Sequence, residues 1–175
     1  MERSGRSAEP AVFDTSSLIF LELLGYIPLL QQLYQVVVPE AVSEELSVHS
    51  GSPGSGVVSL GWVVHRAPGP ESVRRVRSEP PTFGRGEREV IALGLELSCP
   101  VVLDDRKARL RARRVGLEIT GTLGVLLRLN RIGLASRGIE EDLRLLEEAG
   151  MRSSPDLRRT VIEAGRQDEG QQPGR

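Results

Sequence analysis

Ala11-Val-Phe-Asp14-Thr-Ser-Ser-Leu-Ile19 is the stretch that decides how this 175-residue chain folds. Its apolar beginning, Ala11 to Phe13, is typical of a strand buried on both faces. Asp14 ends that run, three small hydroxyl residues follow, and apolar spacing compatible with a helix resumes at Leu18. Strand, polar break and helix form the opening of a βαβ unit, so Asp14 is predicted at the carboxyl end of the strand. Ligands of open parallel sheets bind at that edge.

The alternation of strand and helix continues along the rest of the chain. Further strands are predicted at 36–38, 61–64, 101–103 and 118–120, and helices at 18–25, 26–34, 40–48, 87–97, 106–115, 122–132, 139–149 and 155–164. Residues 50–55 have the composition of a loop, and 66–81, with four prolines, predict a loop or an irregular helix. This order predicts an α/β fold in which helices cover both faces of a parallel sheet.

Length and composition predict one globular domain from 11 to 165, flanked by disordered tails at 1–10 and 166–175. The formal net charge of −1 excludes the global basic field of many nucleic-acid-binding proteins but leaves local basic patches open. The single cysteine, Cys99, excludes an internal disulfide and predicts a cytoplasmic setting. No apolar run is long enough to span a bilayer, so no membrane partner is expected.

Carboxylates end two of the predicted strands, Asp14 after the first and Asp104-Asp105 after the fourth. An aspartate at a strand end is most often a turn or cap residue. Parallel strands all finish at one edge, however, and the coincidence of these acids there favours a site. Two glutamates are further candidates. Glu87 opens a helix, where its carboxylate either interacts favourably with the helix dipole or points into a cleft at the strand ends. Glu45 lies near the core boundary of its helix.

Several carboxylates at one edge repel each other and raise each other's pKa values unless a cation lies between them. Oxygen ligands without histidine or thiolate suit Mg²⁺ or Mn²⁺ rather than zinc. His49 and His65 are predicted in or near loops away from the acids. A magnesium ion held by a few carboxylates is a common device for hydrolysing phosphodiesters.

Five motifs follow one another in an order that one protein family shares: Asp14-Thr-Ser-Ser-Leu-Ile, Val38-Pro-Glu-Ala-Val-Ser-Glu-Glu-Leu46, Gly86-Glu-Arg-Glu-Val-Ile-Ala-Leu93, Val102-Leu-Asp-Asp-Arg-Lys-Ala-Arg109 and Ile119-Thr-Gly-Thr-Leu-Gly124. Together with the segment Leu143 to Leu157, they resemble the PIN domain, specifically the DUF3368 branch that is related to VapC-type toxin nucleases. The resemblance covers about Val12 to Ala164. In one departure, Ser16-Ser17 stand where the family usually has a small residue and a proline.

The resemblance implies a three-layer α/β/α sandwich with a parallel sheet of about five strands and additional C-terminal helices. It also implies an acidic pocket that binds Mg²⁺ or Mn²⁺ and cuts single-stranded RNA. Carried over by position, the catalytic acids are Asp14, Glu45, Glu87 and either Asp104 or Asp105. Of these, Asp14, Glu87 and the Asp104-Asp105 pair are the expected metal ligands.

The expected substrate contacts surround these acids. They include hydroxyl groups at Thr15, Ser16 and Thr122, of which Thr122 is also a candidate helix cap. They also include the basic helix that starts beside Asp105, with the side chains Arg106, Lys107 and Arg109. An arginine-rich helix is either an ordinary solvated surface or a contact for the RNA backbone. With 3% aromatic residues, the chain is expected to read no bases.

The expected partners are RNA, an antitoxin protein and a second copy of the chain, for which the leucines near Leu126 and Leu143 offer either an interface or core. The alternative function is a non-catalytic PIN-like module that binds RNA or a protein. A receiver fold is disfavoured because the only lysine, Lys107, follows the fourth strand rather than the fifth. A haloacid-dehalogenase-type phosphatase is disfavoured because Ser16 stands where it needs a second aspartate.

Overall fold

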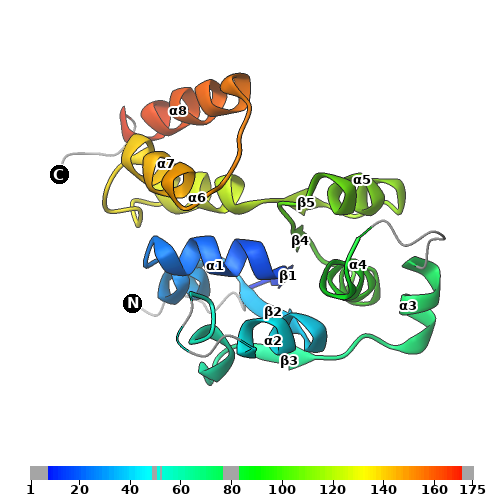
Figure 1. Cartoon of the computed structure of the whole chain (residues 1–175). Coiled ribbons are helices and arrows are strands. Elements are labelled where there is room, and N and C mark those ends of the chain that lie inside the picture. The colour runs from blue at the N-terminus through cyan, green and yellow to red at the C-terminus, as the bar shows by residue number, and fades with distance from the viewer. Residues whose placement is uncertain (1–7, 49–50, 52, 77–82, 171–175) are drawn as a thin grey trace, which may run out of the picture.

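The strands form one parallel sheet in the order β3-β2-β1-β4-β5 (Figure 1). The computed structural model describes residues 8–48, 51, 53–76 and 83–170. Within them, the strands are β1 (Pro10–Phe13), β2 (Gln35–Pro39), β3 (Val64–Arg66), β4 (Val101–Val102) and β5 (Ile119–Thr120). In β1, Val12 pairs with Val37 of β2 on one side and with Val101 of β4 on the other. The predicted α/β architecture is confirmed.

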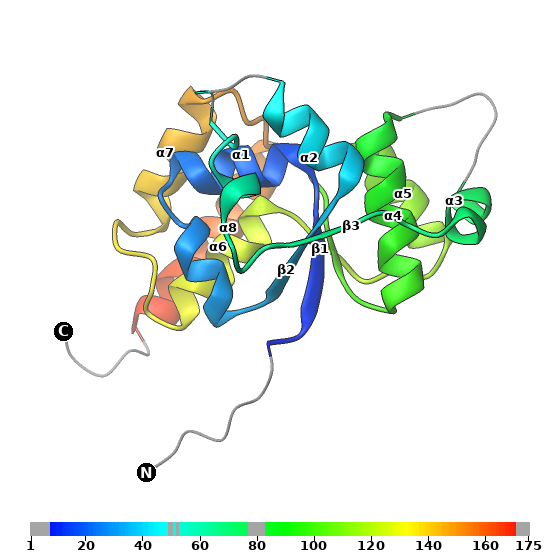
Figure 2. The ribbon, with the colours of Figure 1, turned by 90° about the horizontal axis from the view of Figure 1, so that it is seen from below.

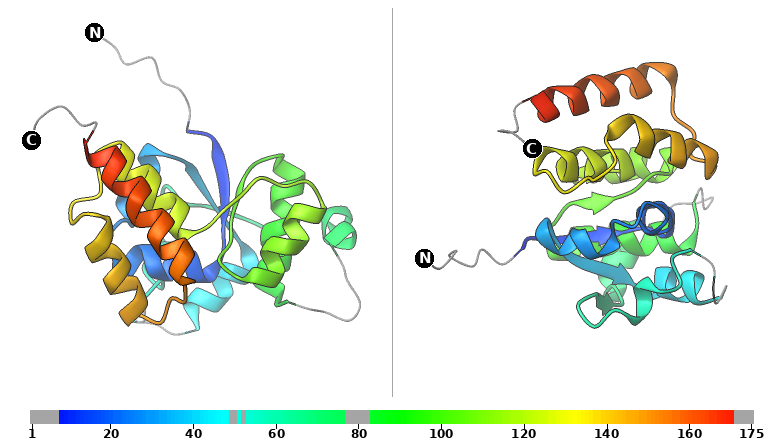
Figure 3. Two further views of the ribbon diagram at one scale, coloured as in Figure 1. Left: turned by 90° about the horizontal axis from the view of Figure 1, so that it is seen from above. Right: turned by 90° about the vertical axis from the view of Figure 1, so that its left-hand side faces the viewer.

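Helices cover both faces of the sheet. The α-helices are α1 (Thr15–Leu23), α2 (Glu40–Ser47), α3 (Pro70–Val76), α4 (Arg85–Leu97), α5 (Arg106–Arg114), α6 (Thr122–Arg131), α7 (Ile139–Glu148) and α8 (Pro155–Gly170), with 3₁₀ turns η1 (Ile27–Gln32) and η2 (Val57–Ser59). Figure 2 shows α1 and α6 on one face and α3, α4 and α5 on the other. Helices α7 and α8 pack beyond α6 as an outer layer (Figure 3).

The core lies on both sides of the central strands. Ala11, Val12 and Phe13 of β1 are fully buried, as the opening apolar run predicts, and so are Val101 and Val102 of β4. Among the described residues, no helix is both long and apolar enough to cross a membrane.

The order of the strands changes direction between β1 and β4. From β1 the chain moves to β2 and β3 on one side, then returns to build β4 and β5 on the other. Helix α1 follows β1 and helix α5 follows β4, and these two helices lie on opposite faces of the sheet (Figure 2). A place where the strand order changes direction in this way is called a switch point, and ligands of open α/β sheets bind there. Asp14 and Asp104 lie at the carboxyl ends of these two strands.

Several predicted boundaries on the N-terminal side are wrong. β3 covers 64–66 rather than 61–64, because a bond from Val63 N to Leu60 O closes a turn over Gly61 and Trp62. α1 starts at Thr15 rather than Leu18, because the Asp14 side chain caps it. The segment 66–81 contains α3. His65 lies in β3, whereas His49 lies outside the described residues.

The C-terminal part also differs from its prediction. α8 runs to Gly170, beyond the expected boundary at 165, and the tail residues 171–175 and 1–7 lie outside the described ranges. Gly165 allows this helix to approach α7 closely, since a Cβ there would lie 2.7 Å from the Ile139 side chain. Leu126 and Leu143 are core residues, 0% and 1% exposed, so they supply no surface for a dimer. Gly121, rather than Thr122, occupies the N-cap position of α6.

Candidate functional site

Asp14 and Asp104 form an adjacent pair at the switch point. Asp14 caps α1, with Oδ1 accepting a hydrogen bond from Ser17 N at 2.8 Å. Its Oδ2 accepts from the backbone N of Asp104 at 3.2 Å. Asp104 is held in turn by Thr122, whose backbone N donates to Oδ1 at 2.9 Å and whose Oγ1 donates to Oδ2 at 2.5 Å. Both carboxylates are therefore fixed by the starts of helices.

The surroundings of Asp14 disfavour its negative charge. The side chain is 3% exposed. Its burial, which is the larger cause, and repulsion from Asp104 together raise its pKa to about 7. The hydrogen bonds from Ser17 and from Asp104 N lower the pKa and offset only part of that rise. A cation beside the pair would compensate both effects.

Glu45 reaches the same neighbourhood from α2. Its Oε2 accepts a hydrogen bond from the Thr15 hydroxyl, one residue after Asp14. Gly86 in α4 leaves room for this carboxylate, because a Cβ there would lie 2.7 Å from Glu45 Oε1. The predicted position of Glu45 near Asp14 thus depends on a glycine in a different helix.

The remaining two acids differ in orientation. Glu87 lines a cavity together with Ser16, Asp104 and Asp105, but its carboxylate turns back toward Gly84 at the start of its own helix, where a Cβ would lie 2.6 Å from Oε2. Asp105 is exposed and caps α5, with Oδ1 accepting from Ala108 N at 2.8 Å. Of the two neighbouring aspartates, Asp104 is therefore the one that faces Asp14.

The described residues contain no group of three or more His, Cys, Asp or Glu side chains that could hold a metal ion. The acids are arranged in smaller sets, and Asp14 and Glu45 do not line the cavity of Glu87. Mg²⁺ is nevertheless commonly held by one or two carboxylates and several waters. Each carboxylate offers about four lone-pair sites, and the hydrogen bonds described above use two on Asp14 and two on Asp104. This all-oxygen pair fits Mg²⁺ or Mn²⁺.

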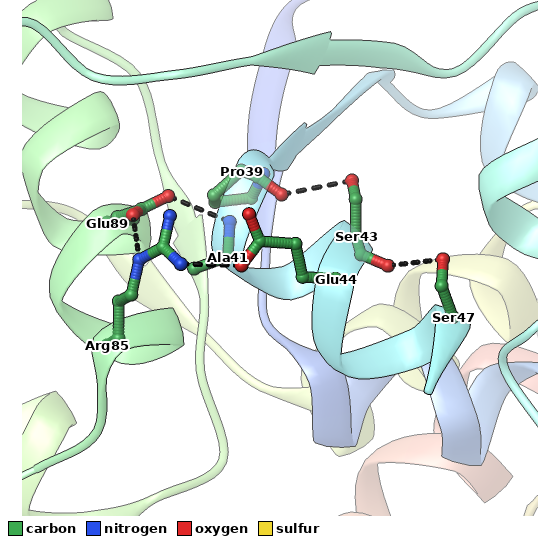
Figure 4. Close-up of polar contacts among 7 residues, drawn as sticks. All are labelled: Pro39, Ala41, Ser43, Glu44, Ser47, Arg85 and Glu89. Carbon is green, nitrogen blue, oxygen red and sulfur yellow. Dashed lines mark hydrogen bonds and ion pairs between the residues drawn. The ribbon is translucent and has the colours of Figure 1, made fainter. Parts of the chain in front are cut away.

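Glu89 is a buried acid that the sequence analysis missed. Its Oε2 accepts a hydrogen bond from Ala41 N at 2.9 Å and so caps the start of α2 (Figure 4). Its Oε1 accepts from Arg85 Nε at 2.9 Å, and Arg85 also pairs with Glu44 at 2.5 Å. Glu89 therefore ties α4 to the helix that carries Glu45. The sequence signal for this residue was an acid within a helix predicted to be buried. In the structure Glu89 is 9% exposed.

We expect Glu89→Ala to lower the free energy of unfolding by about 1–3 kcal/mol, because it leaves Ala41 N without its acceptor in a buried position. Glu44→Ala is the matched control, since it removes the exposed member of the same ion-pair network and should cost less than about 1 kcal/mol. Urea denaturation of both variants measures the difference. Equal losses would show that Glu89 contributes only its surface ion pair.

The basic side chains divide into two groups. Nη1 of Arg109 donates to the backbone carbonyls of Leu103 at 2.6 Å and Thr120 at 2.9 Å, so this guanidinium joins the ends of β4 and β5 instead of projecting freely. Arg106 and Lys107 are exposed. Within the described part of the chain, no cation of α5 belongs to an ion pair, whereas Arg144 of α7 and Arg158, Arg159 and Arg166 of α8 all do. Uncompensated positive charge thus lies on the helix that begins beside Asp105.

Comparison with known proteins gives one family and a distant structural similarity. The sequence profile of DUF3368, described as a PIN domain, matches residues 10–166. No curated protein sequence matches the chain significantly. Similar solved structures include a PilT N-terminus domain protein from the hyperthermophilic archaeon Sulfolobus solfataricus, with 18% identity and a TM-score of 0.43. That match covers 82% of this chain and 96% of the other.

Proposed function

This chain belongs to the DUF3368 family of PIN domains, and from that premise we propose that it is a metal-dependent endoribonuclease that cuts single-stranded RNA. PIN domains are generally nucleases. The observation that carries the proposal is the Asp14–Asp104 pair, in which a buried carboxylate with a pKa raised to about 7 faces a second carboxylate at the switch point of the sheet. Such an arrangement is costly without a cation.

Each residue of the site has a separate task in this proposal. Asp14 and Asp104 hold Mg²⁺ or Mn²⁺, which when bound supplies activation of water and stabilisation of charge on the phosphate. The Thr122 hydroxyl and the Asp104 backbone N fix the two carboxylates, so the ion meets them without reorganisation. We assign to Glu45, which Thr15 holds, and to Glu87, which lines the neighbouring cavity, the orientation of water around the ion.

The test is cleavage of a labelled single-stranded RNA by the purified protein with Mg²⁺ or Mn²⁺, in the presence and absence of EDTA. Metal-dependent cleavage that EDTA stops supports the proposal. The second candidate is a non-catalytic module that binds RNA or a protein, and it is favoured by the lack of any three-acid group among the described residues. RNA binding without cleavage across metals and substrates would favour that second candidate.

We also propose that the chain is the toxin of a toxin–antitoxin pair, with an antitoxin protein and a second copy of the chain as partners besides RNA. An antitoxin protein would have to cover the acid edge to silence cleavage, and a second copy of the chain would form a homodimer. Co-expression with the product of the adjacent gene, followed by the cleavage assay, tests the first. Sedimentation of the purified chain tests the second.

The unpaired cations of α5 are expected to hold the RNA backbone. Replacing Arg106 and Lys107 with glutamine should weaken RNA binding about tenfold and lower the slope of log K against log salt by about 1.4, since each lost phosphate contact contributes about 0.7 for a single strand. Arg144→Gln with Arg166→Gln is the control, because it removes the same charge from cations that already have acidic partners. Equal salt slopes for both double variants would show that α5 lies outside the RNA path.

A further inference from the structure

A cavity of about 690 Å³ opens beside the acid edge, between α1, β5, α6 and the segment that leads into α8. Its lining mixes polar and apolar side chains, and the apolar ones that are partly exposed are Phe20, Ile119, Leu123, Leu127, Met151 and Leu157. The proposed hydrolysis of a phosphodiester at Asp14 and Asp104 gives these side chains no role. Partly exposed apolar side chains that converge on a cavity of this size are typical of a small-ligand site.

The lining also contains charged side chains. Glu87, Asp104 and Asp105 are among them, so the cavity shares Asp104 with the proposed metal site. Two cations, Arg109 and Arg152, line it as well, and Arg152 is exposed and belongs to no ion pair within the described residues. The cavity therefore offers apolar side chains and cations to a ligand that has an apolar part and an anionic part.

We propose that this cavity receives the base of the nucleotide next to the scissile phosphate. The proposal rests on the ribonuclease function and deepens it. In RNA, each phosphate is bonded directly to the two neighbouring nucleosides. A phosphate bound through a metal ion at Asp104 therefore has both nucleosides close to the cavity, which the same aspartate lines. The Phe20 ring supplies a surface on which a base can stack, which every base can do whatever its sequence. Such stacking reads no base sequence, which agrees with the expectation from the low aromatic content.

The direct test compares AMP with ribose 5-phosphate, which keeps the sugar and the phosphate but lacks the base. Calorimetric titration in the presence of Mg²⁺ should show AMP binding at least about fivefold more tightly. Phe20→Leu removes the ring and keeps an apolar side chain. It should remove most of the preference for AMP and leave the affinity for ribose 5-phosphate unchanged.

A second pair of variants keeps the proposal testable if Phe20→Leu unfolds the protein. Leu157 and Leu110 are similarly exposed leucines, 46% and 51%, but only Leu157 lines the cavity. Leu157→Gln should lower the affinity for AMP at least about threefold, and Leu110→Gln should leave it unchanged. Equal binding of AMP and ribose 5-phosphate, or no binding of either, would overturn the proposal.

Two further outcomes distinguish the base site from the ribonuclease activity. A preference for AMP in a protein that cuts no RNA would keep the base site and reject the ribonuclease. Metal-dependent cleavage of an oligonucleotide that proceeds equally well with abasic nucleotides on both sides of the cut would keep the ribonuclease and reject the base site. Binding of an apolar peptide that Leu157→Gln weakens, in a protein that binds no AMP, would overturn the base site and assign the cavity to a protein partner.

Discussion

Asp14→Asn is expected to lower metal-dependent cleavage of single-stranded RNA at least about a hundredfold while the protein stays folded. Losing a partner that only orients a metal ligand typically costs 10–100-fold in affinity or activity, so losing a ligand itself should cost no less, roughly a hundredfold. The fold should survive because asparagine is also a good N-cap and can still accept the bond from Ser17 N. Single-turnover cleavage with Mn²⁺ or Mg²⁺ measures the loss.

Asp156→Asn is the control, since it makes the same substitution at an exposed position of α8, where the carboxylate pairs with Arg159. Asp104→Asn should behave like Asp14→Asn. Asp105→Asn should lose less activity, because Asp105 is exposed and its Oδ1 caps α5. If Asp105→Asn instead equals Asp14→Asn and Asp104→Asn does not, the metal contact belongs to Asp105. Cleavage that is undiminished in Asp14→Asn would locate the activity elsewhere.

The parts of this site that the sequence predicts are those that depend on local pattern. An apolar run ending in Asp14, and another ending in Asp104, predict two buried strands that end at one edge of the sheet, because parallel strands all finish there. The structure confirms both strands and this common edge, and it adds that the two strands are neighbours in the sheet. The family motifs then identify the PIN domain, which the match over residues 10–166 confirms.

The parts that stayed open depend on pairs of residues far apart in the chain. Nothing local distinguishes Asp104 from Asp105, and the preference for Asp104 in the proposal depends on Thr122, whose backbone and hydroxyl bind Asp104. Arg109 was grouped with the surface cations, but the carbonyls at the ends of β4 and β5 hold it. The role of Glu89 follows from Ala41, 48 residues earlier. Helical periodicity describes which face of α4 is buried, but it contains no information about what that face contacts.

The raised pKa of Asp14 leads to a second large effect, on stability. Below about pH 4 the carboxyl is protonated in both the folded and the unfolded chain and makes no difference. Between about pH 4 and pH 7 the unfolded chain loses this proton while the folded chain keeps it, because the pKa rises from 3.8 to about 7 on folding. The free energy of unfolding of the metal-free protein should therefore fall across this window, by up to about 4 kcal/mol from this group, and stay level above it.

Denaturation of wild type and Asp14→Asn in EDTA at pH values from 4 to 8 isolates this contribution, since the other titrating groups are common to both proteins and cancel in the difference. The wild type should become less stable relative to Asp14→Asn as the pH rises, whatever the constant cost of the amide facing Asp104 N. Adding Mg²⁺ or Mn²⁺ at pH 8 should restore stability to the wild type only, because the ion binds the folded carboxylate pair and compensates its buried negative charge. A difference between the two proteins that does not change with pH would mean that water or a bound ion already compensates the buried charge. An equal rise in melting temperature on adding metal to both would place the cation at other residues.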